Sequence, residues 1–227
     1  DLVMYDRQTE TWWQQATGRG LVGEYAGNLL TFIPALVVSW EHVRTHYASA
    51  LVLSRNTGYR RSYGENPYRG YDDLNSGRPL QAFFRGLLDD RLRPMERVVA
   101  VKLGIEVVAY PFSSLERDRV VNDEVGDVEL VVFWAPGTSS ALDARRIDRG
   151  RDIGAGTVYS RRFDGRTLRF EAAGDGRFRD RETGSLWTVT GRATTGPLAG
   201  AQLTPVQHGN HFWFAWSVFQ PLTDVRR

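Results

Sequence analysis

The chain has 227 residues, of which 41% are hydrophobic and 25% charged, and its formal net charge is +2. This is an ordinary globular composition with enough apolar side chains for a buried core. Cysteine is missing from the sequence, which excludes disulfides, thiolate metal sites and a cysteine nucleophile. No stretch reaches the roughly 18 consecutive apolar residues of a membrane helix. A transmembrane segment is therefore not predicted. The arginine-rich segments interleave acidic residues with their arginines, so a nucleic-acid partner is not predicted either.

The first predicted elements are a strand at residues 2–5 and a β-hairpin formed by YDRQTETWWQQATG, from Tyr5 to Gly18. An aspartate that accepts backbone hydrogen bonds, a threonine that closes the turn and a tryptophan on the returning strand account for this hairpin. The sequence FRDRETGSLWTVTG, from Phe178 to Gly191, repeats nearly the same phrase. We therefore predict structural roles for the repeated residues Asp6, Arg7, Thr9, Trp13, Gly27, Asp180, Arg181, Thr183, Trp187 and Gly200.

The stretch after the first hairpin is predicted to contain helices near residues 38–48 and 79–90. Between them lies TGYRRSYGENPYRGYDDLNSGRP, rich in tyrosine, glycine, asparagine and arginine. We expect an ordered loop here, because tyrosine rings are costly to leave in water. Tyrosine and arginine are also the residues enriched at protein interfaces. The interface candidates are Tyr59, Arg60, Arg61, Tyr63, Tyr68, Arg69 and Tyr71.

The second half of the chain is predicted to be rich in strands. Val98 to Pro111 alternates around a turn near Gly104 and indicates a hairpin, and Val128 to Pro136 indicates a buried strand. A further hairpin is predicted at Asp164-Gly165, because this dipeptide supplies the positive φ angles of a type I′ turn. A helix is expected near residues 211–219.

These elements predict a mainly β fold with short helices, in which two sequence-related β-hairpin repeats pack as one globular unit. We expect the back half of a first repeat at residues 1–55, a connecting loop and short helix at 56–95, and a second repeat at 96–227. Predicted strands over residues 96–176 precede the second repeated sequence, whereas only a few residues precede the first. By repeat logic we expect the front half of the first copy to be missing from this chain.

The runs LVMYDRQTETWWQQATG, TGYRRSYGENPYRGY, AYP and DRETGSLWTVTGRATTGPLAG with FWFAW together resemble the bacterial family called domain of unknown function 3179. The resemblance covers essentially the whole chain and implies an exported or membrane-associated protein, hence a periplasmic or membrane-surface location. In the front half of the family pattern, His-Glu precedes Val-Asn-Asp and Cys-Pro-Leu-Cys follows. Here Asp118 and Arg119 precede Val121-Asn122-Asp123, and the next strand continues as FWAPGTSS. This departure favours a non-catalytic role.

Candidate metal ligands are few. His42 and His46 are spaced i, i+4 on a predicted helix, so both rings could meet one metal. The order of residues 41–46, EHVRTH, is not the HExxH of metalloproteases, so a third ligand is not identified. His208 and His211 could complete a site only if the fold brought both copies together. The acidic pairs, such as Asp72-Asp73, are expected to be solvent-exposed residues of turns and helix ends. No metal, cofactor or catalytic residue is therefore predicted.

The sequence favours a non-catalytic extracytoplasmic module that binds other proteins, as an accessory subunit stabilising a larger membrane-associated complex. Abundant aromatic residues and the missing chemical groups support this interpretation. The alternative is a metal- or ligand-binding protein, or an enzyme of unknown reaction, with a site between the two repeats. That site would be lined by His42, His46, Asp72, Asp73 or the loop tyrosines.

Overall fold

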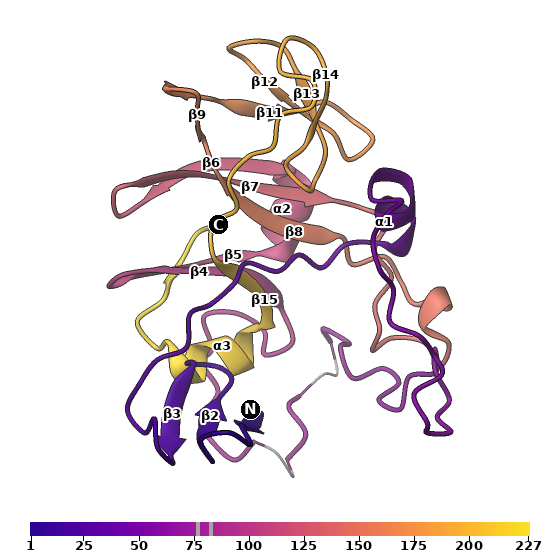
Figure 1. Cartoon of the computed structure of the whole chain (residues 1–227). Coiled ribbons are helices and arrows are strands. Elements are labelled where there is room, and N and C mark those ends of the chain that lie inside the picture. The colour runs from indigo at the N-terminus through magenta and orange to yellow at the C-terminus, as the bar shows by residue number, and fades with distance from the viewer. Residues whose placement is uncertain (76–77, 82–83) are drawn as a thin grey trace.

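The computed structural model describes residues 1–75, 78–81 and 84–227. Its strands form several small sheets, stacked along the long axis of Figure 1. The N-terminal sheet contains β1 (Val3–Tyr5), β2 (Trp12–Gln14) and β3 (Arg19–Val22) in that order, all antiparallel. It lies at the bottom of Figure 1, at the opposite end from the sheet that contains β12 and β14.

Two sheets form the middle of the protein. One has the order β15-β4-β5-β16, with β4 (Arg97–Leu103), β5 (Glu106–Pro111), β15 (His208–Phe212) and β16 (Asp224–Val225). The other has the order β6-β7-β8, with β6 (Val120–Val125), β7 (Val128–Ala135) and β8 (Ala155–Ser160). They lie one above the other in Figure 1. Alternate residues of β4, β5, β7 and β8 meet between them, among them Val99, Tyr110 and Val132.

The sheet at the top of Figure 1 covers the other face of β7 and β8. It has the order β11-β12-β13-β14, with β11 (Phe170–Ala172), β12 (Phe178–Asp180), β13 (Leu186–Trp187) and β14 (Ala193–Thr195). Phe133 of β7, Tyr159 of β8 and Trp187 of β13 belong to one buried cluster. Because β7 buries side chains on both faces, its sequence VELVVFWA is almost continuously apolar.

The helices are short, and their sequence predictions have mixed outcomes. Helix α1 (Trp40–His46) and helix α3 (Trp213–Phe219) lie within the predicted ranges 38–48 and 211–219. Helix α2 (Phe112–Asp118), which follows Pro111 directly, and the 3-10 turn η1 (Ile147–Arg149) were not predicted. The helix expected over 79–90 does not occur in the described residues of that range, 79–81 and 84–90. Exposed Leu80, Leu87 and Leu88 bury no apolar face there, and Gly86 disfavours a helix.

The expected mainly β fold with short helices is confirmed. The Asp164-Gly165 hairpin is also confirmed: it joins β9 (Arg162–Phe163) to β10 (Arg166–Thr167), and both turn residues have positive φ, 49° and 72°. Gly104 turns between β4 and β5 with a φ of 60°. Among the helices described, none has the length and apolar character needed to cross a membrane.

Candidate protein-interaction surface

The N-terminal sheet is organised around the carboxylate of Asp6. Its Oδ1 accepts hydrogen bonds from the backbone N–H groups of Gln8 and Thr9 at 2.9 and 3.1 Å. Its Oδ2 accepts from the Thr9 hydroxyl and, at 3.4 Å, from Trp13 Nε1. These bonds, led by the one from the Thr9 hydroxyl, lower the pKa of Asp6. The carboxylate thus fixes the turn between β1 and β2 and orients the Trp13 ring.

Asp180 makes the same arrangement in the second hairpin. Its Oδ1 accepts from the backbone N–H and the hydroxyl of Thr183 at 2.6 and 2.8 Å, and its Oδ2 accepts from Trp187 Nε1 at 2.8 Å. The Thr183 hydroxyl lies 2.7 Å from Ser185 Oγ, as the Thr9 hydroxyl lies 2.7 Å from Thr11 Oγ1. Each second strand also shifts register directly before its tryptophan. The two hairpins therefore share a local hydrogen-bond pattern.

The matching geometry continues after the hairpins. The N–H of Leu30 donates to Gly18 O at 2.9 Å, and the N–H of Leu203 donates to Gly191 O at 2.9 Å. The two glycines have positive φ angles of 68° and 72°, which glycine adopts without steric cost. Positions Met4, Trp13 and Leu30 of the N-terminal sheet thus match Phe178, Trp187 and Leu203.

Both matched tryptophans are buried, Trp13 at 7% and Trp187 at 0% exposed, but the other two matched pairs differ sharply in burial. Phe178 is 1% exposed and Leu203 is 0% exposed, whereas Met4 and Leu30 are 36% and 41% exposed. In the second sheet, Phe178 stacks on Phe133 of β7 with ring centroids 4.0 Å apart. Within the described ranges, no core cluster of the protein includes a residue of β1, β2 or β3. The N-terminal sheet therefore lacks the covering sheet that its counterpart has.

Exposed apolar side chains are concentrated in the N-terminal quarter of the chain. We use the name N-terminal apolar surface for the exposed large hydrophobic side chains of residues 2–53, which are spread over more than one region, since α1 lies well away from β2 and β3 in Figure 1: Leu2, Val3, Met4, Tyr5, Trp12, Leu21, Val22, Tyr25, Leu29, Leu30, Phe32, Ile33, Val37, Trp40, Leu51, Val52 and Leu53. From Arg91 to the C-terminus, by contrast, the exposed large hydrophobic residues are Ile105, Val218 and Leu222. Large exposed apolar areas mark interaction sites in folded proteins.

The tyrosine- and arginine-rich segment is held by backbone hydrogen bonds to residues 142–147. Asn66 N donates to Arg145 O at 2.7 Å, and Gly70 N donates to Asp143 O at 2.9 Å. Of the interface candidates, Tyr71 is half-buried, and its ring lies 6.1 Å from that of Phe212. The others are exposed: Tyr59, Arg60, Arg61, Tyr63, Tyr68 and Arg69. The backbone is thus anchored while most candidate side chains face solvent.

Asp72 forms a buried ionic cluster that sequence reasoning missed. Its Oδ2 accepts hydrogen bonds from Ser140 Oγ at 2.6 Å and Arg97 Nη2 at 2.8 Å, and Arg151 Nη2 lies 3.1 Å away. Burial alone would raise its pKa, but the bonds from Ser140 and Arg97 and the charge of Arg151 lower the pKa below its ordinary value. The cluster ties the connecting segment to β4. Its partners are distant in sequence, so residue spacing gave no signal.

The four histidines lie in two separate pairs. The rings of His42 and His46 have centroids 4.5 Å apart, and His42 Nε2 lies 3.1 Å from Thr190 Oγ1. His208 Nδ1 lies 2.7 Å from Val206 O, and the His211 ring stacks on Trp216 at 5.1 Å. Burial lowers the pKa of His42, His208 and His211. The described residues contain no group of three or more His, Cys, Asp or Glu side chains suited to a metal ion.

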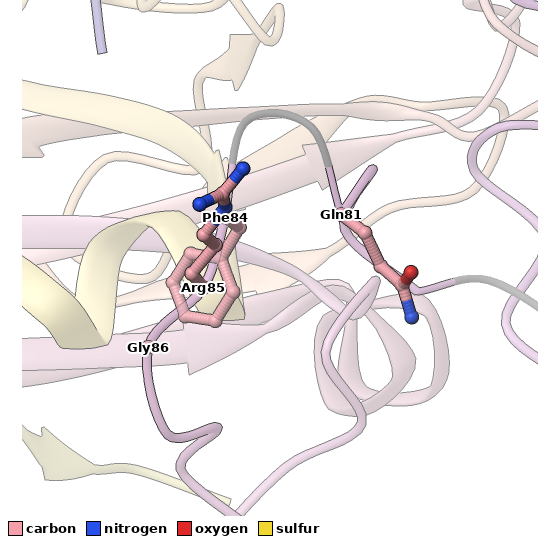
Figure 2. Close-up of a pocket in the computed structure, with 4 residues that line it drawn as sticks. All are labelled: Gln81, Phe84, Arg85 and Gly86. Carbon is pink, nitrogen blue, oxygen red and sulfur yellow. The ribbon is translucent and has the colours of Figure 1, made fainter.

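Two cavities lie within the described residues of the protein. A cavity of about 100 Å³ lies beside His42, between Ser39 and Val189. A second, of about 490 Å³, is lined by Gln81, Phe84, Arg85 and Gly86. Figure 2 shows that the Gln81 side chain does not converge with those of Phe84 and Arg85. Ser39, His42 and Asp175 all line the smaller cavity, but the Ser39 hydroxyl accepts from the backbone N–H of His42 and the Asp175 carboxylate accepts from Arg177.

Comparison of the sequence with known protein families gives a match to one family. Its model, described as "Protein of unknown function (DUF3179)", matches residues 1–223. No curated protein and no solved structure matches the chain.

Proposed function

The chain belongs to the DUF3179 family of proteins of unknown function, and from this premise we propose that it is a non-catalytic protein-interaction or structural module. The observation that carries the proposal is the N-terminal apolar surface. Its members include Ile33, which is 84% exposed, and Leu29, which is 71% exposed. Burying a fully exposed Leu or Ile side chain stabilises a protein by roughly 1.5 to 3 kcal/mol relative to leaving it in water. A partner that covers them would recover part of this free energy.

The tyrosine- and arginine-rich segment adds polar anchors to the proposal. Tyr59 is 71% exposed, and the guanidinium of Arg61 lies 5.8 Å from the centroid of its ring. Tyrosine and arginine are over-represented among the residues that dominate binding energy. Hydrogen bonds to residues 142–147 hold the backbone from Gly64 to Tyr71, so less backbone conformational entropy is lost when Tyr68 and Arg69 bind.

The alternative of a small-molecule site between the two hairpin regions is less well supported. The cavity beside His42 does lie between residues that follow the first hairpin and residues of the second. Its volume is about 100 Å³, whereas ligand pockets in proteins typically measure about 300 to 1,000 Å³. A protein partner fits the large exposed surface better than a small ligand fits this cavity.

We further propose an extracytoplasmic accessory subunit that stabilises a larger membrane-associated complex. The location outside the cytoplasm and the association with a membrane rest on the family resemblance of the sequence. The role in a complex rests on the N-terminal apolar surface. Such a subunit needs binding groups rather than catalytic groups.

The test is purification of the tagged chain from native membranes in mild detergent, followed by mass determination of all co-purifying proteins. The variant Leu29→Glu/Ile33→Glu charges the N-terminal apolar surface. The matched control Ile105→Glu/Leu222→Glu charges residues that are 94% and 92% exposed elsewhere. We expect a stoichiometric partner that the first variant loses and the control retains. A monodisperse monomer without any partner would overturn the proposed function.

A further inference from the structure

The tyrosine- and arginine-rich segment presents a basic surface to solvent. Its exposed members, which we call the arginine–tyrosine surface, are Tyr59, Arg60, Arg61, Tyr63, Tyr68 and Arg69. Arg60, Arg61 and Arg69 form no ion pair with any acidic residue that the structure describes. Three guanidinium groups of this segment are therefore available to an anionic partner.

The carboxylates of this segment and of residues 142–151 are already engaged by other groups. Asp143 and Asp72 both pair with Arg151, at 3.0 and 3.1 Å. The remaining contacts are Glu65 with Arg145 at 3.5 Å, Asp148 with Arg146 at 2.6 Å, and Asp73 with the backbone N–H of Asn75 at 2.7 Å. The arginines of residues 142–151 thus neutralise most of these carboxylates, and the positive charge of the arginine–tyrosine surface is left without an internal counterion among the described residues.

Hydrogen bonds hold the backbone that carries this surface. Thr57 Oγ1 lies 2.6 Å from the Tyr63 hydroxyl, which closes the loop that presents residues 59–61. Ile147 N donates to Gly64 O at 3.0 Å, at the start of the stretch that is bonded to residues 142–147. Figure 1 shows these loops to one side of the stacked sheets. Because the backbone is held, ordering the surface on binding costs less conformational entropy.

An acidic polypeptide segment complements this surface better than a flat anionic surface does. A guanidinium binds a carboxylate through two parallel N–H bonds, and tyrosine rings supply contact area at protein interfaces. A layer of lipid headgroups would also meet the carboxylates of Glu65 and Asp148, whose side chains are 47% and 60% exposed. An extended peptide can contact the arginines and leave these two carboxylates uncovered.

We infer that the arginine–tyrosine surface binds an extended acidic segment of a partner protein, whose carboxylates pair with Arg60, Arg61 and Arg69. This inference rests on the proposed function and specifies the chemistry of the partner. The exposed rings of Tyr59 and Tyr68 pack against the same segment. The binding site shares no residue with the N-terminal apolar surface, so the two surfaces can be tested separately.

The direct test measures binding of the full chain to a fluorescein-labelled deca-glutamate peptide by fluorescence anisotropy, with a deca-glutamine peptide as the neutral comparison. The variant Arg60→Gln/Arg61→Gln/Arg69→Gln removes the three charges. We expect it to bind the glutamate peptide about tenfold more weakly than the unchanged protein does. Added salt should weaken the binding of the unchanged protein, because the pairs are exposed to solvent. Equal binding of the glutamate and glutamine peptides overturns the inference.

The matched control Arg166→Gln/Arg169→Gln/Arg179→Gln lowers the net charge by the same amount elsewhere. These three arginines are exposed and also form no ion pair with a described acidic residue. We expect the control to bind the glutamate peptide within about twofold of the unchanged protein. Equal weakening by both triple variants overturns the inference, because net charge alone would then explain the binding. Binding to phosphatidylglycerol vesicles without binding to the glutamate peptide overturns it in favour of a lipid surface.

Purification from native membranes separates this inference from the proposed function. We expect the variant Arg60→Gln/Arg61→Gln/Arg69→Gln to lose most of the co-purifying partner and the matched control to retain it. Retention of the partner by both variants overturns the inference but leaves the proposed function standing. If no partner co-purifies with the unchanged protein, the proposed function fails, and the inference fails with it.

Discussion

The carboxylate of Asp180 offers the sharpest test of how the second hairpin is stabilised. Asp180 is 0% exposed and accepts hydrogen bonds from Trp187 Nε1 and from the backbone and hydroxyl of Thr183. In Asp180→Ala the Thr183 hydroxyl keeps Ser185 as a partner, but the other two donors lose theirs. Each buried donor left without a partner costs about 1 to 3 kcal/mol. Removing a buried charge offsets part of this cost, so we expect a loss of about 2 to 4 kcal/mol in the free energy of unfolding.

The assay is urea unfolding and thermal unfolding followed by circular dichroism. For a chain of this size the loss corresponds to a fall in Tm of roughly 5 to 15 °C. Asp6→Ala is the matched comparison, because Asp6 makes the same bonds in a more exposed setting where water replaces them, and we expect a smaller loss. Asp148→Ala, which removes an exposed ion pair with Arg146, is the control for charge. An Asp180→Ala variant as stable as Asp6→Ala would refute the reasoning.

Three further perturbations follow from burial and backbone geometry. Asp72→Ala leaves the half-buried guanidinium of Arg97 and the Ser140 hydroxyl without their acceptor, and we expect chemical unfolding to show a loss of about 2 to 4 kcal/mol. Gly191→Ala places a Cβ 2.7 Å from the Tyr159 ring at a φ of 72°. Its Tm should fall further than that of Gly18→Ala, whose Cβ meets the Phe32 ring at 2.8 Å, because Tyr159 is buried whereas Phe32 is exposed and can move aside. Burial lowers the pKa of three histidines below 6.5 in the folded state. The stability that they contribute is therefore present above pH 6.5 and is lost as the pH falls through their folded-state pKa values. A pH series of unfolding midpoints checks this for His42, His208 and His211.

Local motifs were predictable where neighbouring residues determine the structure. The Asp164-Gly165 turn formed as expected because both positions need positive φ, which this dipeptide tolerates. The mainly β composition and helices α1 and α3 also followed from local pattern. The hydrogen bonds expected around Asp6 and Asp180 occur, because each aspartate and its threonine are only three residues apart.

Features that depend on distant residues were not predictable. Asp72 meets Ser140 and Arg97 only after three segments that are distant in the sequence have packed together. The sequence alone shows the pair Asp72-Asp73, which suggested a solvent-exposed turn instead. Helix α2 was missed because its residues, FSSLERD, have no side-chain N-cap hydrogen bond and only modest helix propensity. The uncovered face of the N-terminal sheet was likewise visible only when the burial of Met4 and Phe178 could be compared.

The strand order β15-β4-β5-β16 has a consequence for how the protein reaches its native state. The two inner strands, β4 and β5, are complete by Pro111, but their outer neighbours come much later in the sequence, at His208–Phe212 and Asp224–Val225. During translation the β4–β5 hairpin is therefore synthesised long before its flanking strands. Contacts of such high sequence separation slow folding and leave strand edges open in the meantime. Chains cut short near residue 207 are expected to be prone to aggregation and a preferred target of quality-control proteases.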